Sequence, residues 1–251
     1  MDLKTFFTEN PRFAIAFSGG VDSSYLLHEA SMFGCDVKAY FVKSLLQPQF
    51  ELDDAAKLAY MLSIPMTVET IDILSNTEVA RNPADRCYHC KKAVFSRIWE
   101  LAREDGYEVL CDGTNASDDA SERAGMRALS ELGVRSPLRE CGLTKKEIRR
   151  LSCNAGLFTH DKPSYACLAT RIPTGTALTE ELLSRVEQAE RAMHGVGFSD
   201  FRIRYYNGAA RIQIPESQFK SVIDKRKKIV DVVSPYFDTV FLDLVPRKTE
   251  V

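Results

Sequence analysis

The sequence predicts an α/β fold, with a parallel sheet carrying helices on both faces and a small C-terminal α+β subdomain. In the first half, short apolar stretches alternate with stretches of helical length and periodicity, which is typical of a parallel sheet. A stretch rich in proline and glycine then precedes a tail of mixed strand-like and helix-like segments. We therefore expect a first domain over 1–160, a linker over 161–178 and the subdomain over 179–251.

The elements of the first domain follow from short apolar runs that are typical of buried strands. We expect strands at 13–17, 37–42, 66–71 and 108–111, and helices between them at 22–33, 50–63, 90–104 and 120–132. Ligands of such sheets bind beyond the carboxyl ends of the strands. Two polar stretches, Ser18–Ser23 and Asp112–Asn115, lie just past such ends.

The rest of the chain adds a capped helix and the subdomain. Thr144 and Glu147 have the spacing of a capping box, which predicts a helix to about Asn154. In the tail we expect a helix at 179–194, strands at 201–206 and 209–214, a helix at 216–233 and a strand at 237–243.

Composition narrows the function classes. The 251 residues are 45% hydrophobic and 27% charged, as in a soluble globular protein, and the formal net charge of −2 argues against a strongly basic nucleic-acid surface. No apolar stretch approaches the roughly 20 residues that span a bilayer, and the N-terminus lacks a signal-peptide pattern. We expect a cytoplasmic protein, in which seven cysteines point to metal or redox chemistry rather than disulfides.

A glycine-rich turn follows the first expected strand and reads Ser18-Gly19-Gly20-Val21-Asp22-Ser23. Glycines let a backbone approach an anion, and a helix that begins there directs unpaired N–H groups toward it. No Gly-Lys-Ser/Thr follows, so the turn is not a Walker A loop. It resembles the PP-loop of the ATP pyrophosphatase superfamily, whose members cleave ATP between the α and β phosphates.

Cys87 and Cys90 form a CxxC motif, which fits a redox dithiol, half of a zinc site or part of an iron–sulfur site. Cys167, in the irregular linker, is the best candidate to join them. The other cysteines stand in expected core elements or without a spacing signal: Cys35, Cys111, Cys141 and Cys153.

Three thiolates would leave one iron of a [4Fe–4S] cluster open, and we favour this over zinc, which would want a fourth ligand such as His89 or His160.

Five segments together resemble the LarE family of ATP-dependent sulfur transferases over nearly the whole chain. They are Phe17–Ser23, Arg86–Lys92, Asp112–Ala116, Arg135–Leu138 and Lys162–Pro173. The resemblance implies adenylation of a carboxylate on a pyridinium mononucleotide and its conversion to a thiocarboxylate, a step toward a nickel-pincer nucleotide. It also suggests a homo-oligomer.

The resemblance implies two sulfur sources. Some members consume one cysteine of their own, which aligns with Cys167, and others hold a [4Fe–4S] cluster on three cysteines. This chain has the three-cysteine pattern, so we expect Cys87, Cys90 and Cys167 to be cluster ligands. A sulfide donor is then the implied partner, with no membrane or nucleic acid.

The site residues follow from the chemistry of the parts. Ser18, Gly19, Gly20 and Ser23 would hold the phosphates of ATP, and Asp22 would orient Mg²⁺. The turn of Asp112, Gly113, Thr114 and Asn115 would close over the nucleotide, although the same residues also form ordinary Asx turns.

The resemblance implies that Arg202 and Arg204, on one face of a strand, bind the substrate phosphate, with Arg123 a weaker candidate. Solvent-exposed strand arginines are the alternative interpretation of the pair.

Three other functions stay open. A tRNA thiolase would share the loop and the cysteines, but the near-neutral charge and the absence of flanking zinc-binding CxxC pairs argue against it. An amide-forming synthetase would leave the cysteines unexplained. A nucleotide-binding regulator would need no cysteines and would release no pyrophosphate.

Overall fold

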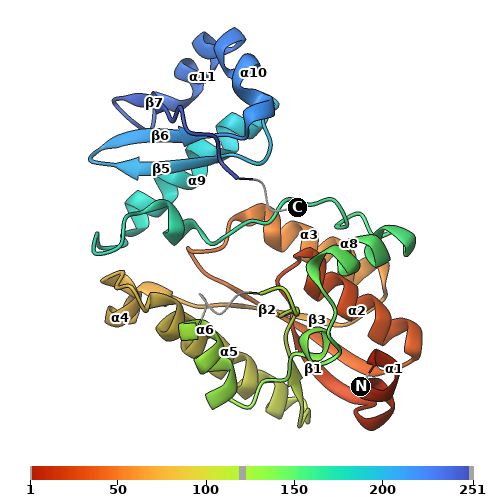
Figure 1. The fold of residues 1–251 in the computed structure, drawn as a ribbon. Helices are drawn as coiled ribbons and strands as arrows, with labels where there is room; N and C mark the ends of the chain where they lie inside the picture. Colours follow the sequence, from red (N-terminus) through yellow and green to blue (C-terminus); the bar gives the residue numbers. More distant parts are fainter. Residues whose placement is uncertain (1, 119–122, 249–251) are drawn as a thin grey trace. The chain divides into compact units, whose positions relative to one another are not determined.

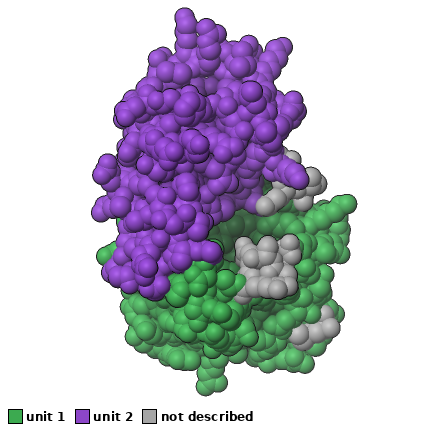
Figure 2. All heavy atoms as spheres, turned by 60° about the vertical axis from the view of Figure 1, so that its left-hand side comes forward, with its two compact units in different colours: residues 1–73, 85–162 green, residues 74–84, 163–251 purple. Residues whose placement is uncertain are grey.

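The computed structural model describes residues 2–118 and 123–248, with the side chain of Arg123 outside the description. These residues form two compact units (Figure 2). The first comprises residues 1–73 and 85–162, and the second comprises residues 74–84 and 163–251. Within the described residues, no helix has both the length and the apolar character needed to cross a membrane.

The first unit is built on a parallel sheet, which confirms the predicted fold class (Figure 1). Its described strands are ordered β3-β2-β1-β4 and pair in parallel throughout. They are β1 (Arg12–Ala16), β2 (Asp36–Lys43), β3 (Met66–Thr70) and β4 (Leu110–Cys111).

Helices cover both faces of this sheet because the central strands alternate apolar side chains between two cores. Phe13 and Ile15 join one core, whereas Ala14 joins the other. The first core is lined by α1 (Leu3–Glu9), α2 (Val21–Phe33), α3 (Gln49–Met61), α7 (Pro137–Glu140) and α8 (Lys145–Asn154). The second is lined by α5 (Arg86–Glu104), beside which α6 (Arg123–Glu131) packs.

The start of α8 confirms the predicted capping box. The Thr144 hydroxyl accepts from the backbone N–H of Glu147, and the Glu147 carboxylate accepts from the backbone N–H of Thr144. These bonds satisfy amide groups that the first helical turn leaves unpaired, and they fix where α8 begins.

The second unit contains an antiparallel and parallel mixed sheet of order β5-β6-β7. Its elements are η3 (Leu168–Arg171), α9 (Glu180–Gly195), β5 (Arg202–Tyr206), β6 (Ala209–Gln213), η4 (Glu216–Gln218), α10 (Phe219–Asp224), α11 (Arg226–Val233) and β7 (Val240–Leu242). The expected single helix at 216–233 is wrong, because it is broken at Lys225, whose ammonium donates to the carbonyl of Val196.

Residues 74–84 also cluster with the second unit. They carry α4 (Thr77–Ala80), which follows the short turn η1 (Ile73–Ser75). The fully buried Asn82 explains this placement, since its side-chain amide donates to the carbonyls of Pro173 at 2.9 Å and Thr176 at 3.1 Å.

Candidate active site

The glycine-rich loop lies between the end of β1 and the start of α2, against α3. Gly19 has φ +70°, and a Cβ there would stand 2.9 Å from the carbonyl oxygen of Glu51 and 3.1 Å from the Cβ of Ala55. Both the backbone conformation and the lack of space therefore require glycine. The loop is held at the carboxyl end of the sheet, where ligands of parallel sheets bind.

Two serine hydroxyls shape the loop from inside. The Oγ atoms of Ser18 and Ser23 are 3.0 Å apart, and the Ser18 hydroxyl also accepts from the N–H of Gly20. Gly20 is the N-cap of α2, so no side chain caps this helix. The first N–H groups of α2 are left for an anion, together with the positive end of the helix dipole.

Asp22, in the first turn of α2, forms an ion pair with Lys145 of α8. The Lys145 Nζ is 2.5 Å from Asp22 Oδ2, whereas Oδ1 is buried and has no hydrogen-bond partner. Burial raises the pKa of Asp22 above its ordinary value, and Lys145 opposes that shift. A buried carboxylate oxygen without a partner is costly, and it is the ligand type that Mg²⁺ prefers.

The turn after β4 packs directly on the start of α2. A Cβ at Gly113 would stand 2.7 Å from the backbone nitrogen of Ser23, so only glycine fits between the two backbones. Asp112 accepts from the hydroxyls of Thr114 and Ser136. Burial raises the pKa of Asp112, and these hydrogen bonds oppose the shift.

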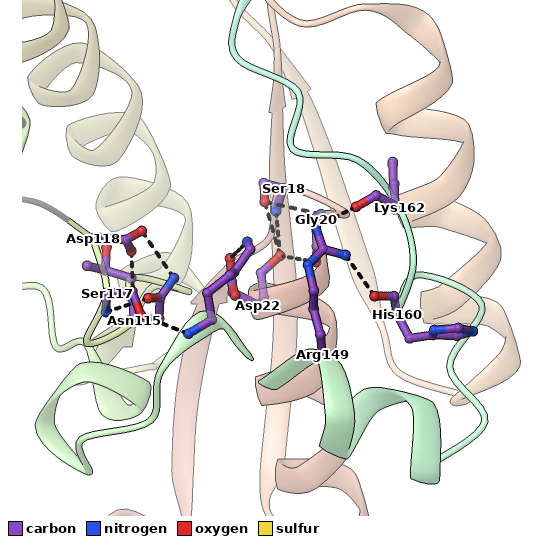
Figure 3. Close-up of polar contacts among 12 residues, drawn as sticks. Ser18, Gly20, Asp22, Asn115, Ser117, Asp118, Arg149, His160 and Lys162 are labelled. Carbon is purple, nitrogen blue, oxygen red and sulfur yellow. Dashed lines mark hydrogen bonds and ion pairs between the residues drawn. The ribbon is translucent and has the colours of Figure 1, made fainter. Parts of the chain in front are cut away.

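Asn115 completes this turn and is fully buried. Its backbone and side-chain amides both donate to Asp118, and its Oδ1 accepts from the N–H of Ser117 (Figure 3). The Ser117 hydroxyl in turn accepts from the backbone N–H of Lys145 at 3.0 Å. The Asp112–Asn115 turn, the start of α8 and the glycine loop thus form one hydrogen-bonded assembly.

Three cations beside the loop were not among the predicted site residues. They are Lys145, which pairs with Asp22, and Arg149 and Lys162, which Figure 3 shows near Gly20. Lys162 forms an ion pair with Asp54 at 2.6 Å and donates to the Gly19 carbonyl at 3.3 Å. Arg149 donates to the carbonyls of His160 and Lys162. Two of them had a sequence signal that was not used: Lys145 directly follows the N-cap Thr144 of the predicted helix, and Lys162 begins one of the segments that resemble the LarE family.

The cysteine motif lies at the N-terminal end of α5, also in the first unit. Cys87 and Cys90 are three residues apart on a helix, so their side chains share a face. Cys87 is exposed and Cys90 is half-buried, as ligands of an added group need to be. Thiolates in this arrangement fit a cluster or zinc site at that face.

Cys167 belongs to the second unit, where it precedes η3. The convergence of the three thiols therefore stays a prediction. Among the residues that the structure describes, no three His, Cys, Asp or Glu side chains are arranged to hold a metal ion.

The predicted phosphate ligands Arg202 and Arg204 lie on β5, and both reach the segment that carries Cys167. Arg202 donates to the carbonyl of Ser164, and Arg204 donates to the carbonyl of Thr170. They therefore share one face of the strand, as the alternation predicts, but Arg202 is buried rather than solvent-exposed. The third candidate, Arg123, begins α6, and its side chain lies outside the described residues.

The chain is similar in sequence to known proteins over most of its length. The chain is 35% identical over 209 residues to the pyridinium-3,5-bisthiocarboxylic acid mononucleotide synthase of Lactiplantibacillus plantarum, covering 82% of this chain and 76% of that protein. It is 36% identical over 224 residues to an uncharacterised protein of Synechocystis, covering 88% and 83%. A probable tRNA sulfurtransferase of Methanobrevibacter smithii is 25% identical over 193 residues, covering 72% and 50%. No model of a protein family matches the chain.

The chain has a glycine loop at the first βα turn of a parallel sheet and is similar to tRNA sulfurtransferases, and together these findings define its class as the PP-loop ATP pyrophosphatase superfamily. The mixed C-terminal sheet belongs to the small α+β subdomain that the sequence also predicts. Within that class the chain belongs to the LarE family of sulfur transferases, as the 35% identity over most of both chains shows.

Proposed function

We propose that this protein uses ATP to adenylate a carboxylate of a pyridinium dicarboxylate mononucleotide and converts that carboxylate to a thiocarboxylate. The observation that carries the proposal is the uncapped start of α2, with Asp22 and Lys145 paired beside it. The substrate class comes from the name of the Lactiplantibacillus relative.

The nucleotide would bind at the carboxyl end of the first sheet. The backbone of Ser18, Gly19, Gly20 and Ser23 would hold its phosphates, and the unpartnered oxygen of Asp22 would take Mg²⁺. Lys145, which pairs with Asp22, would neutralise charge on the same phosphates. The Asp112–Asn115 turn would form the wall of the site, since Gly113 already contacts the loop.

The reaction then has two steps. A carboxylate oxygen of the substrate attacks the α-phosphorus of ATP, and the bond to the β-phosphate oxygen breaks to release pyrophosphate. A sulfur nucleophile next attacks the acyl carbon, and AMP leaves with the original carboxylate oxygen. The loop would favour the first step, because its N–H groups and the neighbouring cations stabilise the negative charge that develops on the leaving pyrophosphate.

Cys87, Cys90 and Cys167 would supply the sulfur step by holding a [4Fe–4S] cluster. When bound, that cluster would supply an open iron that keeps a sulfide for transfer. The alternative is a sacrificial Cys167, whose thiol forms the acyl–sulfur bond itself. Cleavage of its Cβ–S bond, with loss of the α-proton, would then leave dehydroalanine in the chain.

Arg202 and Arg204 would bind the phosphate of the substrate mononucleotide. Burial lowers the pKa of Arg202 to about 10, and burial together with Arg171 lowers the pKa of Arg204. Among the described residues neither has a carboxylate partner. Two guanidinium groups on one strand face, one buried and one half-buried and neither hydrogen-bonded to any described carboxylate, favour the binding of an anion.

The nucleotide chemistry is tested by product analysis. Mg-ATP with the pyridinium substrate should give AMP and pyrophosphate, and Asp22→Asn should suppress turnover in a folded protein. Formation of ADP and phosphate instead would contradict the superfamily mechanism. Thiolation of tRNA under the same conditions would favour the alternative function of a tRNA thiolase. The probable tRNA sulfurtransferase of Methanobrevibacter smithii is 25% identical to the chain over 193 residues.

The sulfur source is tested by anaerobic purification with iron and sulfide analysis, followed by mass spectrometry after turnover. A cluster enzyme should turn over repeatedly with added sulfide, lose activity in air and keep its mass. A loss of about 34 Da from Cys167, the mass of one H₂S, would instead establish the sacrificial mechanism.

A further inference from the structure

The segment that carries Cys167, residues 164–170, is held by its main-chain carbonyl groups. Near its two ends, Arg202 donates to the carbonyl of Ser164 and Arg204 donates to the carbonyl of Thr170. Between them, Arg171 Nη1 donates to the carbonyl of Ala166 at 2.6 Å and to that of Cys167 at 3.3 Å. Three cationic side chains thus fix a short segment, whose last residues belong to η3, through the backbone on either side of the thiol.

Arg171 is the central member and is fully buried with Glu190 of α9. Its Nε is 3.0 Å from Glu190 Oε1 and its Nη2 is 3.2 Å from Oε2, the fork geometry of a bidentate pair. Glu190 also accepts from the backbone N–H of Ile203 at 2.9 Å and from the hydroxyl of Tyr165. The carboxylate therefore ties the arginine to α9 and β5 at once.

Stability alone does not explain this pair. Burying two charges costs about as much as their attraction returns, and apolar residues of similar volume commonly stabilise a core equally well. An apolar pair could not hold the carbonyls of Ala166 and Cys167, however. The distinctive contribution of Arg171 is thus the placement of the main chain at the cysteine.

We propose that Arg171, oriented by Glu190, is a positioning residue that holds Cys167 in place for sulfur delivery. The role in sulfur delivery rests on the proposed function, whereas the contacts of Arg171 with the cysteine segment do not. Arg202 and Arg204 lack carboxylate partners among the described residues, so an arriving phosphate can draw them from their carbonyls. The charge of Arg171 is already compensated by Glu190, so its hold on the segment persists when substrate binds.

The test compares Arg171→Lys with Arg185→Lys. Lysine keeps the charge opposite Glu190, but one ammonium lacks the planar fork that reaches the carboxylate and the carbonyls together. Arg185 is the matched control, because it donates to the carbonyl of Tyr236 at 3.0 Å and does not contact the segment. Iodoacetamide labelling of the reduced, metal-free protein is followed at Cys167, with the exposed Cys153 as internal reference.

We expect the Cys167-to-Cys153 labelling ratio to rise about tenfold in Arg171→Lys and to stay unchanged in Arg185→Lys, because loss of charged hydrogen bonds frees the segment. A ratio within about twofold of wild type, or an equal rise in the control, would overturn the proposal. If Arg171→Lys does not fold, Glu190→Gln decides by the same criterion.

Turnover gives the second measurement. Formation of AMP should continue in Arg171→Lys, while thiocarboxylate formed per AMP falls about tenfold. A parallel loss of both products together with a lower unfolding temperature would show a merely structural role. If wild type forms no AMP at all, the proposed function fails, and the labelling ratio still decides whether Arg171 positions Cys167.

Discussion

The contact between Gly113 and Ser23 permits a direct test of the nucleotide site by one added methyl group. In Gly113→Ala the new Cβ would lie 2.7 Å from the backbone nitrogen of Ser23, about 0.7 Å closer than the 3.4 Å at which ordinary contact begins. It would also lie 3.0 Å from both Cα and Cβ of Ser23. Since the obstacle is backbone, no flexible side chain can move aside, and the start of α2 or the Asp112–Asn115 turn must shift.

The size of the effect follows from that displacement. Overpacking of this kind costs about 1–3 kcal/mol, which a domain with an unfolding free energy of about 5–15 kcal/mol tolerates. Misplacing a catalytic group by about 1 Å costs about 100-fold in rate. We therefore expect kcat/KM for ATP to fall by about 10- to 100-fold in a protein that remains folded.

The assay is release of AMP and pyrophosphate from Mg-ATP, with thermal unfolding measured on the same preparation. Gly195→Ala is the matched control, because a Cβ at this helical position meets nothing within 4 Å. It should keep full turnover and gain up to about 1 kcal/mol of stability. Wild-type kcat/KM in Gly113→Ala would refute the claim that this contact positions the phosphate loop.

Three further predictions concern charge and sulfur. Because burial raises the pKa of Asp112 above its ordinary 3.8, the folded state binds this proton more tightly than the unfolded state, and this contribution to stability is lost as pH rises through the folded pKa. Asp112→Asn removes this pH-dependent loss. The free energy of unfolding, measured with urea between about pH 4 and 6, should therefore rise more steeply with pH in the variant than in wild type. The same pH dependence in both proteins would contradict the raised pKa. Lys145→Ala should raise the apparent KM for ATP about tenfold, since a cation next to the phosphates is lost, while Lys146→Ala should not; equal effects in steady-state kinetics would exclude a specific role. Cys87→Ser should lose both iron and sulfur transfer but bind ATP as wild type does, whereas the control Cys153→Ser should retain iron, sulfur transfer and ATP binding. Iron analysis and ATP titration check this prediction, and iron retained by Cys87→Ser would count against the cluster.

The main elements of the first unit were predicted from patterns among residues that are close in sequence. The apolar runs became β1 and β2 within one residue at each end, and the glycine loop lies between β1 and α2 as expected. The capping box also formed as predicted. Each of these depends on residues close in sequence, where steric limits and hydrogen-bonding capacity act directly.

The helix at 216–233 shows where local pattern was insufficient. Its periodicity is helical on both sides of Lys225, yet the helix is interrupted at this residue, whose ammonium donates to the carbonyl of Val196. That partner is 29 residues away, so no window of sequence contains the contact.

The sequence by itself determined the class of this protein, since a glycine turn after a buried strand is a local feature. Only the tertiary structure decided which side chains complete the site. Asp22 and Lys145 are 123 residues apart, and Arg171 and Glu190 are joined through a helix and a linker. The physical reason is that the sheet order and the helix packing bring such charges together, and burial then makes each depend on the partner it meets.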